Sequence, residues 1–131
     1  MYQLDNRNVP EFLKRFYGFT DSLVRKIEIA YIDGRNRTIS IWIATRDAKE
    51  GKNEGWVQVK FVVFGAKDYC FADTANKCAG LISHGVSILW FNGIVGLDFG
   101  YFVDPPADLA EMKSSKFFAT GTSVSWSVEP Y

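Results

Sequence analysis

Hydrophobic and polar residues alternate along three consecutive segments of the chain, residues 23–31, 38–44 and 57–64. Successive side chains of a strand point to opposite faces, so a period of two predicts strands with one apolar face. The predicted apolar face consists of Leu23, Ile27, Ile29, Tyr31, Ile39, Ile41, Ile43, Val57, Val59, Phe61 and Val63. The opposite face is mixed, as is common for antiparallel sheets that face solvent on one side. These segments therefore predict a three-stranded antiparallel meander.

The sharpest local signal is Asn92-Gly93, which separates two apolar segments, residues 86–91 and 94–99. Both residues tolerate positive φ angles, so this dipeptide predicts a hairpin with a two-residue turn. Such a turn sets the register. The predicted opposite pairs are Trp90–Val95, Ile88–Leu97 and Val86–Phe99 on one face, and Phe91–Ile94, Leu89–Gly96 and Ser87–Asp98 on the other.

The remaining elements follow from caps and turn residues. Residues 9–17 predict a short helix with Asn8 as N-cap, whose aromatic side is expected to pack on the sheet. A short second helix is expected near residues 105–113, capped by Asp104. Residues 67–72 are read as a strand, 73–80 as a turn-rich segment, and 117–128 as a single last strand. The predicted fold class is α+β, mainly an antiparallel sheet of about six to seven strands.

Length and composition narrow the class of protein. The chain has 131 residues, of which 47% are hydrophobic, which fits one globular domain over residues 1–131 and excludes a disordered chain. Its formal net charge is zero, so general attraction to nucleic acid or to anionic lipid is not expected. Charge is uneven along the chain, because residues 1–67 carry a formal +4 and residues 68–131 a formal −4.

The cysteines and the apolar segments bear on location. The chain has two cysteines, Cys70 and Cys78, too few for a zinc framework, and we expect both as buried, reduced thiols. Residues 1–7 contain no apolar signal core, and no apolar stretch approaches the roughly 20 residues that span a bilayer. We therefore expect a cytoplasmic protein with no membrane contact, no metal and no cofactor.

Candidate catalytic groups are few. His84 is the only histidine, and a pairing with Cys78 or a serine, oriented by Asp98, would make a small hydrolytic or ligand-binding site. Such a triad needs three groups placed at once, so a histidine in a turn or in the core is the preferred interpretation. The sequence thus favours a protein that is not an enzyme.

Candidate binding residues fall into two groups. Trp42 and Trp56 are expected on or near the more polar face of the meander, where tryptophans serve as interface anchors. Basic residues interleave with Trp42, which leaves single-stranded nucleic acid as an alternative ligand; they are Arg25, Lys26, Arg35, Arg37, Arg46 and Lys60. The acidic residues Asp98, Asp104, Asp108 and Glu111 would mimic phosphates towards the basic cleft of a nuclease.

One feature resembles a known group of proteins. A short helix, then Phe19-Thr20-Asp21-Ser22, then an alternating strand is similar to small bacterial proteins of unknown function. Residues 55–61, GWVQVKF, and 96–100, GLDFG, add to the resemblance, although the common version has His in place of Thr20. Some of these proteins neutralise a neighbouring secreted toxin. The resemblance therefore implies a protein-binding module, an immunity protein whose partner is a toxin, with the oligomeric state left open.

Overall fold

A computed structural model describes residues 1–51, 53–72 and 81–131, so the turn-rich segment predicted for 73–80 lies outside the described residues. Helices are few: α1 (Val9–Arg15), α2 (Leu109–Met112) and the 3-10 turns η1 (Tyr17–Phe19) and η2 (Asn53–Gly55). The strands are β1 (Tyr2–Gln3), β2 (Ser22–Tyr31), β3 (Arg37–Arg46), β4 (Trp56–Phe64), β5 (Tyr69–Phe71), β6 (Leu81–Ile82), β7 (Val86–Phe91), β8 (Ile94–Phe99), β9 (Phe117–Gly121) and β10 (Ser123–Glu129). The α+β class dominated by antiparallel strands is confirmed, but six to seven strands was an underestimate.

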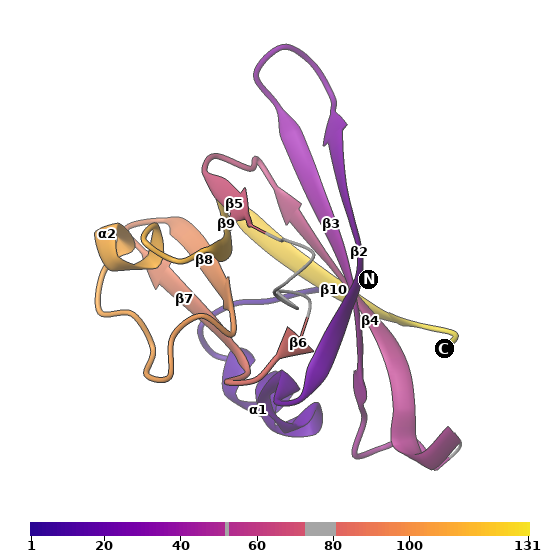
Figure 1. Cartoon of the computed structure of the whole chain (residues 1–131). Helices are drawn as coiled ribbons and strands as arrows, with labels where there is room; N and C mark the ends of the chain where they lie inside the picture. The colour runs from indigo at the N-terminus through magenta and orange to yellow at the C-terminus, as the bar shows by residue number, and fades with distance from the viewer. Residues whose placement is uncertain (52, 73–80) are drawn as a thin grey trace.

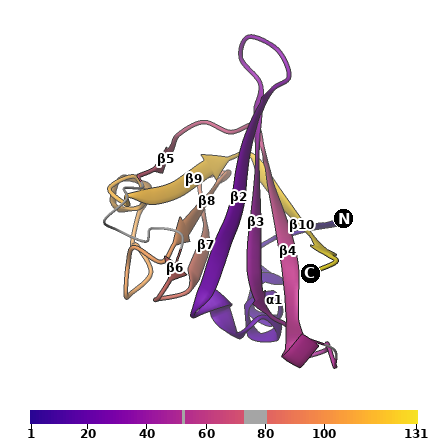
Figure 2. The same ribbon diagram turned by 45° about the vertical axis from the view of Figure 1, so that its right-hand side comes forward.

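The strands form two antiparallel sheets (Figures 1 and 2). Sheet A has the order β1-β10-β4-β3-β2-β6, and sheet B has the order β5-β9-β8-β7. Apolar side chains of both sheets share one core, which includes Ile41 and Phe61 of sheet A and Leu97 and Phe99 of sheet B. The side of sheet A that faces away from this core is called the outer face below.

The meander is confirmed, with one correction at its first strand. Ile27 pairs with Ile41 and Ile29 with Ile39, as alternation predicted. A register shift between Val24 and Lys26 changes the faces below it, because a bulge inserts one extra residue. Leu23 therefore lies 40% exposed opposite Ala44, and Val24 takes its place on the core side.

The β7–β8 hairpin has the predicted register at every pair, from Phe91–Ile94 to Val86–Phe99. Asn92 and Gly93 adopt φ angles of 50° and 82°, the left-handed values that a two-residue turn requires. The local turn chemistry was therefore sufficient to place these twelve residues.

The last predicted strand is wrong as a single element, because residues 117–128 form two strands in different sheets. β9 pairs with β8 and β5 in sheet B, and β10 pairs with β4 and β1 in sheet A. The chain crosses at Gly121, where a Cβ atom would lie 2.5 Å from Val63 Cγ1. Only glycine permits this close passage over β4, so the sheets join where the side chain is missing.

Helix α1 closes one end of the core (Figure 1). Its ring of Phe12 lies 5.7 Å from that of Phe61 on β4 and 4.8 Å from that of Trp126 on β10. Asn8 is the N-cap residue, yet its side chain caps nothing and instead accepts from the backbone N–H of Asp5. The second helix starts later than predicted, because Asp108 caps it and Asp104 does not.

Candidate functional site

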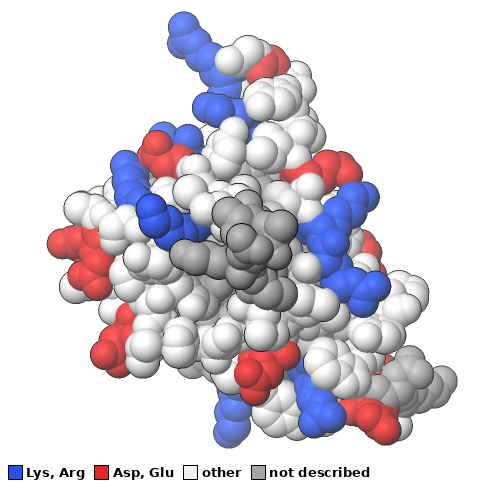
Figure 3. All heavy atoms as spheres, viewed as in Figure 1, with Lys and Arg blue, Asp and Glu red and all other residues white. Residues whose placement is uncertain are grey.

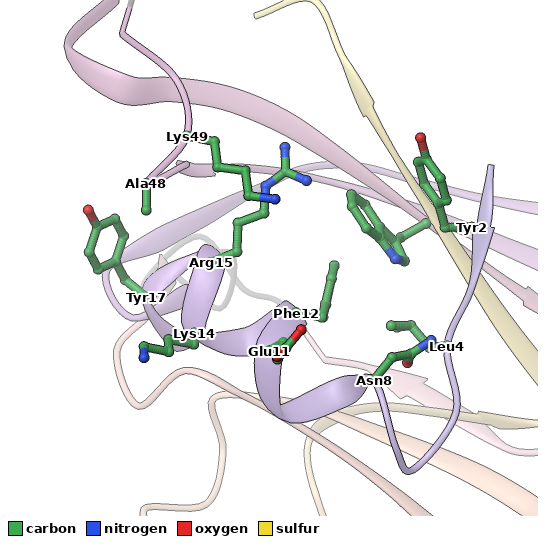
Figure 4. A pocket seen from close by; sticks show the side chains of 11 residues that line it. Tyr2, Leu4, Asn8, Glu11, Phe12, Lys14, Arg15, Tyr17, Ala48 and Lys49 are labelled. Atoms are coloured by element: carbon green, nitrogen blue, oxygen red, sulfur yellow. The ribbon is translucent and has the colours of Figure 1, made fainter.

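The largest hollow of the described residues is a groove of about 820 Å³ beside α1. Its lining comes from four parts of the chain: the N-terminal segment, α1 with the turn that follows it, the loop after β3, and β10. The lining residues are Tyr2, Leu4, Asn8, Glu11, Phe12, Lys14, Arg15, Tyr17, Ala48, Lys49 and Trp126. Figure 4 shows side chains from α1 and the 48–49 loop gathered around this hollow, with Tyr2 on the strand across from them. We call it the α1 groove.

Aromatic rings form the floor of the α1 groove. Trp126 lies on the core-facing side of β10, where it pairs with Phe61 of β4. Pairing of Tyr2 with Trp126 places the two rings 5.0 Å apart, and Phe12 approaches Trp126 from the helix side. Phe12 is 5% exposed, whereas Tyr2 is 65% exposed, so the floor runs from the core out to solvent.

One wall of the groove is fixed by an ion pair. The Arg15 guanidinium donates Nε–H and Nη2–H to the two carboxylate oxygens of Asp47, at 2.9 and 2.8 Å. The backbone N–H of Ala48 donates to the Arg15 carbonyl, so the loop is tied to the helix twice. The hydrogen bond from Arg15 holds the pKa of Asp47 below its usual range, and that from Asp47 raises the pKa of Arg15. This wall is therefore set before any ligand arrives.

The rim of the groove carries charges that are not engaged. Lys14, Lys49 and Glu11 form no ion pair with any described residue, although all three are exposed and line the groove. The Arg15 guanidinium, by contrast, is covered by the rings of Phe16 and Trp126, 4.9 and 5.4 Å from its central carbon. The groove thus combines an aromatic floor with unpaired rim charges of net positive sign.

The outer face of sheet A holds Trp42 and Trp56, as predicted, but their surroundings are already filled. The ammonium groups of Lys26 and Lys60 lie 4.6 and 4.9 Å from the Trp42 ring centroid, and its indole N–H donates to Glu129 at 2.9 Å. Trp56 is covered by the Arg46 guanidinium at 5.6 Å. These basic side chains have partners on the face itself, which weakens the alternative of nucleic-acid binding there.

The acidic set does not form one surface. Asp98 is fully buried, so it is removed from the predicted partner-binding residues; it accepts from Ser115 Oγ at 2.7 Å and from the Phe102 backbone N–H at 3.2 Å. Burial raises the pKa of Asp98, and these hydrogen bonds oppose the shift. Asp104, Asp108 and Glu111 are exposed on the segment that leads into α2, across the molecule from the outer face (Figure 1).

The predicted catalytic grouping is not assembled by the described residues. His84 is exposed and makes no hydrogen bond or ion pair with any of them, while Asp98 is engaged by Ser115. Cys78 lies outside the described residues, and Cys70 is a free, half-buried thiol. Within residues 1–51, 53–72 and 81–131 no group of three or more His, Cys, Asp or Glu side chains could hold a metal ion.

The Thr20-Asp21-Ser22 segment borders a second hollow of about 460 Å³. Ser22 Oγ donates to Thr45 Oγ1 of β3 at 2.6 Å, so this serine bonds the neighbouring strand and not the turn's own backbone. Asp21 has φ of 58°, and its backbone N–H donates to the Ile82 carbonyl at 2.8 Å. These contacts give the segment a structural role in joining β2 to β3 and β6.

The charge difference between the two halves of the chain does not produce a large patch in the view of Figure 3. Basic and acidic side chains lie interspersed around the edge of this face. No helix among the described residues is long and apolar enough to cross a membrane.

Comparison with protein-family models, with curated proteins and with solved structures finds no match to this chain. The α1 groove was not predicted from the sequence, although Phe12 was expected on the packing side of the helix. Its signals were dispersed, since Tyr2, Arg15, Asp47 and Trp126 come from positions far apart in the chain. Two exposed basic residues beside an aromatic helix face were the one local hint.

Proposed function

We propose that this chain is a non-enzymatic protein-binding module that accepts an apolar side chain of a partner protein in the α1 groove. The observation that supports this is the aromatic floor of Phe12, Trp126 and Tyr2 beside a wall already fixed by Arg15 and Asp47. Tryptophan, tyrosine and arginine supply most of the energy of protein interfaces, and a preset wall lowers the entropy cost of binding.

The rim charges define the chemistry of the partner segment. Lys14 and Lys49 outnumber Glu11 on this rim, and none of the three has an ion partner among the described residues. A segment with an aromatic or large aliphatic side chain and a carboxylate a few residues away would therefore fill the floor and pair with the lysines. Such pairing chiefly steers association and selects between partners.

A secreted toxin encoded nearby is the first class of partner to test, and the protein would meet it in the cytoplasm as an immunity protein. Support for this class comes from the resemblance of residues 9–31 and 55–61 to small bacterial proteins. Exposed Asp104, Asp108 and Glu111 would remain available for a second contact, without Asp98. If the toxin is a nuclease, those carboxylates would face its basic cleft.

Peptide display tests the groove without knowledge of the partner. A random peptide library is selected on the immobilised protein, and the selected peptides are measured against a Lys14→Glu/Lys49→Glu variant. We expect peptides that combine an aromatic or large aliphatic residue with a nearby Asp or Glu, and at least about ten-fold weaker binding to the variant.

The matched control is Lys67→Glu, which changes an exposed lysine that does not line the groove. Peptides that share no such composition, or that bind the rim variant and the Lys67→Glu control equally well, would contradict the proposal.

A further inference from the structure

Strand β2 lies at an edge of sheet A that the described residues leave mostly open. On one side it pairs with β3 along its length, and on the other β6 covers only Ser22 and Leu23. From Val24 onward no described strand lies on that side, and the β2–β3 hairpin projects beyond the rest of the molecule (Figure 1). Open edges of this length are sites for pairing with another strand.

The hydrogen-bonding direction of β2 shows what this edge offers. The backbone N–H of Ile32 donates to the Asn36 carbonyl at 2.8 Å, across the hairpin. Because antiparallel strands alternate in direction, Ala30 and Glu28 also bond to β3, while Ile27, Ile29 and Tyr31 direct their backbone groups outward.

The edge lacks the devices that usually prevent pairing. Proline and inward-pointing charges serve that purpose in natural sheets, and residues 26–32 contain no proline. Their core-facing positions are Ile27, Ile29 and Tyr31, and their charges, Lys26 and Glu28, lie on the outer face and pair with each other at 3.3 Å. The bulge at the Val24–Lys26 step and strand β6 mark where the flat part of the edge ends.

We infer that β2 pairs edge to edge and antiparallel with β2 of a second copy of this chain, about a twofold axis at Ile29. This register sets Ile29 opposite Ile29 and Ile27 opposite Tyr31 of the second copy, so that one row of apolar residues continues across the axis. Tyr31 and Ile32, 70% and 66% exposed in the single chain, both become covered. This inference goes beyond the proposed function and does not involve the α1 groove.

Charge and length favour this occupant and this register. With Ile29 at the axis, Arg25 of each copy approaches Asp33 of the other, an opposite-charge contact made twice. A register one pair lower in the strand would place Glu28 against Glu28, which is unfavourable. The hairpin end of the second copy stops near Arg25, just before the position that β6 occupies. Pairing over about seven residues gives a small interface, so we expect a dimer that dissociates on dilution.

Analytical ultracentrifugation of the full chain tests the inference. We expect concentration-dependent dimer formation in the submillimolar range, weakened about ten-fold or more by Tyr31→Pro. Proline removes an outward N–H and no bond to β3, so the fold is retained. Tyr31→Ala keeps the N–H, and we expect its dimerisation to be reduced less than that of Tyr31→Pro.

Oxidative cross-linking reads the register directly and does not depend on the proline variant folding. In a chain with Cys70→Ser and Cys78→Ser, Ile29→Cys is expected to form a disulfide-linked dimer, because paired Cα atoms about 5.5 Å apart suit a disulfide. Ala30→Cys, which faces Glu28 of the second copy, is the control and is expected to cross-link poorly. A chain that sediments as a monomer throughout, or a dimer without the Ile29→Cys cross-link, would overturn the inference.

Discussion

The α1 groove and the outer face of sheet A are built from the same residue types, but they differ in what their charges already do. On the outer face, Trp42 is held between Lys26 and Lys60, and its indole donates to Glu129. In the groove, Arg15 is engaged with Asp47 and Trp126, whereas the rim lysines have no ion partner among the described residues.

The difference shows that aromatic residues beside basic ones do not by themselves mark a binding surface. A ligand that docks on the outer face must displace contacts which Trp42 and the lysines already make, and it gains only the difference. A ligand in the groove meets rings and charges whose capacity is unused, on a support that is already rigid. The predictions below separate the two regions, beginning with the largest expected effect.

Phe12→Ala is expected to lower the free energy of unfolding by about 3–4 kcal/mol, because it empties the floor of the groove. Phe12 is 5% exposed and its ring contacts those of Phe16, Phe19, Phe61 and Trp126. Urea denaturation followed by tryptophan fluorescence measures the loss. The matched variant on the outer face is Trp42→Ala, for which we expect about half that loss, since Trp42 is only half-buried. Equal losses would contradict the division into a core-linked groove and a surface network.

Arg15→Ala is expected to cost about 1–3 kcal/mol near neutral pH, because buried Asp47 then loses its donor. Arg15 holds the pKa of Asp47 below its unfolded value, so the pair stabilises the fold fully above an unfolded pKa of about 3.9. That contribution is lost as the pH falls through the lower, folded pKa of Asp47.

The stability difference between the wild type and Arg15→Ala should therefore shrink on acidification, and denaturation at a series of pH values measures it. The exposed pair Lys26–Glu28 on the outer face is the control, and Lys26→Ala should cost about 0.5 kcal/mol or less. A difference for Arg15→Ala that stays constant to low pH would show that packing on Phe16 and Trp126, not the ion pair, carries the effect.

The success of sequence reasoning depended on how local the cause was. The β7–β8 hairpin was correct at each pair because Asn92-Gly93 sets both the turn and the register. The break between β9 and β10 was missed because it depends on the closeness of Gly121 to Val63, a contact between residues far apart in sequence. Leu23 was misplaced because a bulge beside it leaves alternation intact in the sequence while it changes the face.

The same reasoning applies to the site. Trp42 and Trp56 were placed near the correct face by the period of two, but their partners, such as Glu129, come from a strand whose position the sequence does not reveal. Asp98 was expected at the surface because an acid in an alternating strand usually faces water. It is buried because Ser115 and the Phe102 backbone, both after β8 in the chain, supply its hydrogen bonds.

Trp42→Phe tests how far the outer face is occupied by its own contacts. The variant keeps an aromatic ring between Lys26 and Lys60 but removes the hydrogen bond to Glu129, so we expect a loss of about 1 kcal/mol in the free energy of unfolding. Peptides selected on the α1 groove should bind this variant with unchanged affinity. Weaker peptide binding would place Trp42 in the binding surface and undo the comparison.

Lys14→Glu/Lys49→Glu is expected to have the smallest effect on stability, about 0.5 kcal/mol or less, because neither lysine has an ion partner to lose among the described residues. Most of that change should come from Lys14, since it lies in the last turn of α1, where a positive charge favours the helix end. Thermal unfolding by circular dichroism measures it. A loss of stability comparable with that of Arg15→Ala would mean that the rim lysines are engaged in the folded chain, and the unused capacity that distinguishes the groove from the outer face would not exist.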